Sequence, residues 1–72
     1  MQYNKALLDG AELLRLRQVL RVVPVAASTW WVWVRDGRAP KPIKLGPRTT
    51  CWRASDILAF IERVRVEGED ER

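Results

Sequence analysis

The side chains best able to do chemistry in this chain are cations, and they gather in its middle. Residues 27–53 carry six lysines and arginines against one carboxylate, a net charge of +5, whereas the whole chain of 72 residues has a net charge of +4. Residues 54–72 carry three arginines against six carboxylates. A concentrated positive patch attracts polyanions, so the chemistry indicated is the binding of phosphate groups.

Catalytic and metal chemistry are not indicated. The chain has no histidine, no glycine-rich phosphate loop, and a single cysteine, Cys51, with no partner for a disulfide or a zinc site. We therefore expect neither an enzyme nor a cofactor. Because the sequence has no apolar run long enough to span a bilayer and no signal-peptide pattern, we expect a cytoplasmic protein with no membrane partner.

The cations must be positioned by a single small domain, which the hydrophobic pattern divides into short elements. Residues 13–16 (LLRL) suit a small strand, and residues 17–23 suit a short helix that Pro24 ends. Residues 26–34 have Trp30, Trp33 and Val34 at helical spacing, although their β-branched and aromatic content also suits a strand. Ser28 and Thr29 as N-cap types, with a stop at residues 36–37, favour a helix.

A hairpin and a last helix complete the pattern. Two prolines make residues 39–42 extended, and the runs 43–45 and 48–52 flank Gly46-Pro47 as a hairpin. Ser55 is expected to cap a helix over 56–66 that Gly68 ends. The fold class predicted is mainly α with a small β-hairpin, a winged helix-turn-helix. It comprises a flexible leader (1–12), the domain itself (13–67) and an acidic tail (68–72).

With these motifs in place, the chain resembles the AlpA family of prophage regulators, which are related to phage excisionases and more distantly to MerR-type winged helices. The resemblance covers roughly residues 13–62. The matching residues are Leu14, Leu16, Val19, Ser28, Thr29, Gly37, Pro40, Pro42, Lys44, Leu45, Gly46, Arg48, Trp52, Arg53, Ser55, Asp56 and Ile57. The resemblance implies a small regulator that binds double-stranded DNA, with the helix beginning near Ser28 in the major groove and the Lys44–Arg48 hairpin against the backbone or minor groove.

Nine residues are the candidate contacts with DNA: Ser28, Thr29, Trp31, Arg35, Arg38, Lys41, Lys44, Arg48 and Arg53. Several have structural alternatives. Ser28 suits a helix cap and Arg35 suits the C-terminal end of a helix dipole. Arg53 suits an ion pair. Since adjacent helix positions point about 100° apart, Trp30, Trp31 and Trp33 cannot all face one core.

Departures from the family pattern keep two other functions open. Val32 stands where a basic residue is common, so the helix carries few polar groups that could read bases. That favours an architectural DNA-bending factor of low specificity. A module that docks through its tryptophan-rich helix onto a recombinase or another copy of itself is the alternative from a different class.

Overall fold

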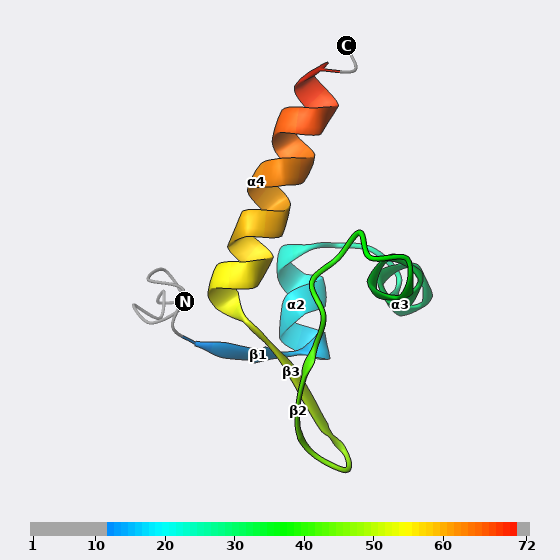
Figure 1. Ribbon diagram of the computed structural model, residues 1–72, viewed down its shortest axis with the longest axis vertical. Coiled ribbons are helices and arrows are strands. Elements are labelled where there is room, and N and C mark those ends of the chain that lie inside the picture. Colours follow the sequence, from blue (N-terminus) through cyan, green and yellow to red (C-terminus); the bar gives the residue numbers. More distant parts are fainter. Residues whose placement is uncertain (1–11, 71–72) are drawn as a thin grey trace.

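The computed structural model describes residues 12–70, which form three helices and three strands (Figure 1). In chain order these are β1 (Leu13–Arg15), α2 (Leu16–Val22), α3 (Ala27–Arg35), β2 (Ile43–Gly46), β3 (Thr49–Arg53) and α4 (Ala54–Asp70). The order of elements agrees with the prediction from the hydrophobic pattern. Apart from residue 12, the predicted leader lies outside the described residues.

The strands form one antiparallel sheet in the order β1-β3-β2. In the register, Leu14 lies opposite Trp52 and Ile43 lies opposite Cys51. The backbone N–H of Ala54 donates a hydrogen bond of 2.7 Å to the carbonyl of Glu12, just beyond the paired residues. The fold is therefore mixed α/β. The small strand expected at residues 13–16 joins the expected hairpin in one three-stranded sheet, so the β structure is more than the small hairpin named in the predicted fold class.

The core is built around two fully buried tryptophans. The rings of Trp30 from α3 and Trp52 from β3 meet edge to face with centroids 5.9 Å apart, and Phe60 from α4 packs on Trp30 at 5.6 Å. The remaining buried members of this cluster are Leu14, Val19, Val23, Ala39, Ala54 and Ile57. Aromatic rings supply much of the area that so short a chain must bury, and here they join α3 to the sheet and to α4.

α3 begins earlier than its hydroxyl residues suggested. Its N-cap is Ala26, whose carbonyl accepts a hydrogen bond of 3.0 Å from the N–H of Trp30, and no side chain caps the helix. Ser28 and Thr29 thus lie inside the first turn, and the expectation that one of them caps the helix is wrong. The chain already turns at Val23 and Pro24, so the helix begins at Ala27, before the hydroxyl residues.

The end of α3 is a Schellman motif, and this confirms the stop predicted at residues 36–37. Gly37 has a φ of 81°, its N–H bonds to the carbonyl of Val34 at 3.2 Å, and the N–H of Arg38 bonds to the carbonyl of Trp33 at 2.8 Å. A glycine adopts this left-handed conformation without the steric cost that a Cβ adds. The motif directs the chain out of α3 toward the extended segment before β2.

α4 extends beyond both predicted ends. It starts at Ala54, so Ser55 lies inside the helix rather than capping it, and it continues through Gly68 to Asp70. β3 leads into α4 without a loop, which removes the position where a cap would sit. In Figure 1 the C-terminal half of α4 projects away from the sheet, and residues 62–68 are all exposed.

Candidate nucleic-acid interface

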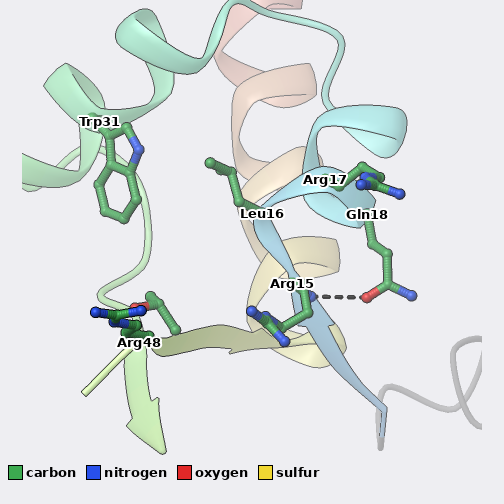
Figure 2. A pocket seen from close by; sticks show the side chains of 7 residues that line it. Arg15, Leu16, Arg17, Gln18, Trp31 and Arg48 are labelled. Carbon is green, nitrogen blue, oxygen red and sulfur yellow. Dashed lines mark hydrogen bonds between the residues drawn. The ribbon is translucent and has the colours of Figure 1, made fainter. Parts of the chain in front are cut away.

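A groove of about 580 Å³ lies between α3, the start of α2 and the β2–β3 hairpin. Its lining residues are Arg15, Leu16, Arg17, Gln18, Trp31, Arg48 and Thr50. Figure 2 shows Trp31 and Arg48 on one side of the groove, with Leu16 and Arg15 facing them from the other. Three arginines and one aromatic ring therefore share one concave surface.

Strand pairing brings these residues together from distant parts of the chain. β1 pairs with β3 so that Arg15, at the end of β1, lies opposite Cys51. Arg17 follows in the first turn of α2, whose start is fastened by a hydrogen bond of 2.9 Å from the N–H of Arg15 to Oε1 of Gln18. Arg48 reaches the same groove from the hairpin turn.

Trp31 is the aromatic side chain of the groove, which it lines together with the apolar Leu16. It is 40% exposed, whereas Trp30 and Trp52 are fully buried and Trp33 is half-buried. Its ring packs on Trp52 at a centroid distance of 5.6 Å. Of the four tryptophans, Trp31 is the exposed one, and contact with the buried Trp52 holds its ring in place.

The charged side chains that line the groove are all positive. Arg15, Arg17 and Arg48 are all exposed, and none of the lining residues is acidic. Among the side chains of residues 12–68, no carboxylate forms an ion pair with any of the three, since the pairs found there join Arg35 to Asp36 and Arg65 to Glu62. Three guanidinium groups with no carboxylate partner among the described side chains attract an anionic ligand, and their planar donors match phosphate oxygens.

The hairpin carries its cations next to this groove. Lys44 is exposed, and its Nζ donates a hydrogen bond of 3.2 Å to Oγ1 of Thr50, a groove-lining residue on the paired strand. Arg48 lies in the turn between the two strands. The predicted pair, Lys44 and Arg48, therefore meets the groove from the hairpin side.

Ser28 and Thr29 occupy the N-terminal turn of α3. Ser28 is exposed and Thr29 is half-buried. The first backbone N–H groups of a helix have no intrahelical acceptor, and no side chain caps those of α3. Such a helix start, with two hydroxyls beside it, suits an anion.

Four predicted contacts lie elsewhere. Arg35 pairs with Asp36 at 3.3 Å, and Lys41 is exposed on the extended segment before β2. Arg38 lies 5.5 Å above the ring of Trp33, and its carbonyl accepts a hydrogen bond from Arg63 of α4. Arg53 ends β3 five residues from Arg48, about 17 Å away along an extended strand. The structure does not bring these four into the groove.

Reasoning from the sequence missed Arg15 and Arg17. Both belong to the strand and helix predicted before the candidate contacts, and neither is among the nine predicted contacts with DNA. The available signal was the run LLRLRQ, in which two arginines alternate with leucines at a strand-to-helix boundary. That they face the groove follows from pairing β1 with β3, which a local pattern does not reveal.

Other kinds of site are not found among the described residues. No group of three or more histidine, cysteine, aspartate or glutamate side chains there is placed to hold a metal ion. Cys51 is buried, and its Sγ contacts the carbonyl of Ile43 at 3.7 Å. No helix in the described part of the chain is long and apolar enough to cross a membrane.

Comparison with known proteins gives a match that covers most of these elements. The family model described as prophage CP4-57 regulatory protein (AlpA) matches residues 12–66. The chain belongs to the AlpA family. The matched range takes in all three strands, α2, α3 and most of α4 of this AlpA-family protein, including every residue of the groove. Comparisons with curated proteins and with solved structures gave no match.

Proposed function

We propose that this AlpA-family protein regulates a prophage or integrated element by binding double-stranded DNA as a winged helix-turn-helix. In this proposal α3 enters the major groove, and the β2–β3 hairpin, here called the wing, lies against the backbone. The observation that carries the proposal is the groove beside α3, lined by Arg15, Arg17, Arg48 and Trp31 with no acidic side chain.

The arrangement of the two short helices supports this docking. Residues 23–26 join α2 to α3 in a turn, as a helix-turn-helix requires. Ser28 and Trp31 are exposed on α3, and the unpaired N–H groups at its start suit a phosphate. Most contacts offered by this surface are charge-based, and such contacts position a protein on DNA without reading its sequence.

The test is binding of the protein to a fluorescent duplex of random sequence, followed by anisotropy. If Arg15, Arg17, Lys44 and Arg48 each neutralise one phosphate, affinity falls about 150-fold between about 50 and 200 mM salt, because the slope is about −0.9 per contact. The double variant Lys44→Ala, Arg48→Ala then loses about two units of slope, and its affinity falls only about 12-fold over the same range.

A matched double variant, Arg21→Ala with Arg65→Ala, removes the same charge from outside the groove. We expect it to keep the slope of the wild-type protein, since neither residue lines the groove. Absence of binding at the lower salt concentration would refute the proposal. So would an equal loss of slope in the two double variants, because that result would assign the effect to net charge alone.

The low-specificity alternative has its own supporting observation. Val32 is 40% exposed on α3, beside the 40% exposed Trp31, so this helix presents apolar surface where base-reading side chains are expected. A small ratio between the affinities for specific and random DNA would favour an architectural factor. The same apolar surface also fits a protein-docking module, which would show concentration-dependent association without DNA that Trp31→Ala abolishes.

A further inference from the structure

The most exposed large apolar side chain described lies at the tip of the wing. Leu45 is 59% exposed, whereas the other exposed large hydrophobic side chains are at 43% or less. A residue in this position adds nothing to the buried core. Leu45 belongs to β2, two residues before the turn at residues 47–48, and its exposed side chain leaves it available for a role outside folding.

A bulge in β2 turns Leu45 outward. Lys44 pairs with Thr50 and Gly46 pairs with Thr49, so Leu45 is the unpaired residue between them. In a regular strand Leu45 would share the face of the half-buried Ile43, but the bulge interrupts this alternation, and Lys44 and Leu45 are both exposed. Bulges are a means of re-aiming a side chain.

The tip that carries Leu45 is positively charged, and two features restrain its backbone and strands. Pro47 restricts the backbone of the turn, and the hydrogen bond between Lys44 and Thr50 ties the two strands together beside it. Lys44 and Arg48 stand on either side of Leu45 in the chain, and both are exposed. An apolar side chain between two cations suits a surface that is apolar in a recess and anionic on both rims.

We infer that Leu45 is a wedge that enters the minor groove of DNA and partly unstacks a base step, while Lys44 and Arg48 hold the phosphates on either side. This inference rests on the proposed function. Apolar side chains that enter the minor groove kink the duplex by about 20–90°. Pyrimidine–purine steps such as TA unstack most readily, so the wedge favours them over a stiff run of adenines.

The experiment uses two duplexes of equal length with G·C clamps. One contains alternating TA steps and the other an uninterrupted A-tract. Each carries dyes at its two ends to report bending by energy transfer, and a parallel set carries 2-aminopurine to report unstacking. The full chain is compared with Leu45→Ala, Leu45→Met and Leu58→Ala. Leu58 is a matched control, since it is 42% exposed and lies on α4.

For the wild-type protein, Leu45→Met and Leu58→Ala, we expect saturation to bend the alternating duplex by about 20° or more and to increase the fluorescence of 2-aminopurine. Leu45→Ala should still bind, with about tenfold lower affinity, because it loses the leucine surface that contact with DNA would bury. It should neither bend the duplex nor increase the fluorescence of 2-aminopurine. Thermal unfolding of all four proteins should be similar, since both leucines are exposed.

Three results would overturn the wedge. The first is bending by Leu45→Ala equal to that of the wild-type protein, and the second is binding by the wild-type protein without bending or unstacking. In both cases the proposed function survives, because anisotropy still reports binding. The third is no binding by the wild-type protein to either duplex, which refutes the proposed function and the wedge together.

Discussion

Replacing Trp52 with phenylalanine should destabilise the protein more than the same replacement at Trp30. Both indoles are fully buried, and both changes remove the same atoms and leave an aromatic ring. They differ at one atom. Nε1 of Trp52 donates a hydrogen bond of 3.0 Å to the carbonyl of Pro40, whereas the buried Nε1 of Trp30 has no hydrogen-bond partner among the described residues.

The expected magnitudes follow from this difference. Loss of packing costs about 1–2 kcal/mol of unfolding free energy in each variant. Trp52→Phe also loses a hydrogen bond worth about 1 kcal/mol, whereas Trp30→Phe removes a buried donor that had no acceptor. Trp52→Phe should therefore be less stable than Trp30→Phe by about 1 kcal/mol or more, which is about 4–8 °C in Tm for a domain of this size.

Urea unfolding followed by far-ultraviolet circular dichroism measures this difference without depending on tryptophan fluorescence. The midpoints should differ while the m-values agree, because both variants expose similar surface on unfolding. A Trp30→Phe variant that is as unstable as Trp52→Phe, or less stable, would refute the reasoning. The hydrogen bond to Pro40 would then contribute nothing measurable to holding the segment between α3 and β2.

Three further predictions concern the helices. Gly37→Ala should lower the free energy of unfolding by about 1 kcal/mol. The loss comes from the left-handed backbone alone, since no atom lies within 4 Å of an added Cβ. Gly37→Asn should lower the free energy of unfolding by less, and thermal unfolding of the two variants compares them. Gly68→Ala should instead stabilise the protein, by up to about 1 kcal/mol of unfolding free energy, because Gly68 lies inside α4 with open space around it. A destabilised variant would contradict this. The hydrogen bond and charge of Arg65 lower the pKa of the exposed Glu62 carboxyl, so the stabilisation from this pair is present above the ordinary glutamate pKa and is lost as pH falls through the lowered value. Arg65→Ala should raise the pKa of Glu62 in an NMR titration, and an unchanged value would exclude the pair.

Local patterns predicted the order of elements, and they did so where periodicity and chain stops agree. The helical spacing of Trp30, Trp33 and Val34, with the stop at Gly37, placed α3 to within one residue at each end. The hairpin was predicted from its turn residues, Gly46-Pro47, and the structure places the turn one residue further on. These signals lie within a few residues of the feature they predict.

Errors arose where a residue type was taken as a boundary. Ser28 and Ser55 are good N-cap types, yet both lie inside helices, because the preceding turn and strand β3 allow each helix to begin earlier. Gly68 favours a helix end only weakly, and an exposed helix tolerates one glycine at a cost of about 1 kcal/mol. Capping preferences compete with the geometry of the preceding chain, and here that geometry prevails.

The candidate site was predictable only in part for a related reason. Trp31, Lys44 and Arg48 belong to elements recognisable from local sequence, and the structure places all three at or beside one groove. Arg15 and Arg17 join them through the pairing of β1 with β3, and the outward turn of Leu45 depends on a bulge. Register and pairing between distant segments decide both features, and no short window of sequence contains that information.

The position of β1 next to the central strand has a kinetic consequence. Arg15 lies opposite Cys51 and Leu13 opposite Arg53, so this pairing closes a loop of about 36–40 residues that contains α2, α3 and the wing. Helices as short as α2 and α3 are marginal by themselves in water. The groove between α3, the start of α2 and the wing therefore cannot assemble before this pairing forms, and we expect the chain to fold in one cooperative step that is slower than its helical content suggests.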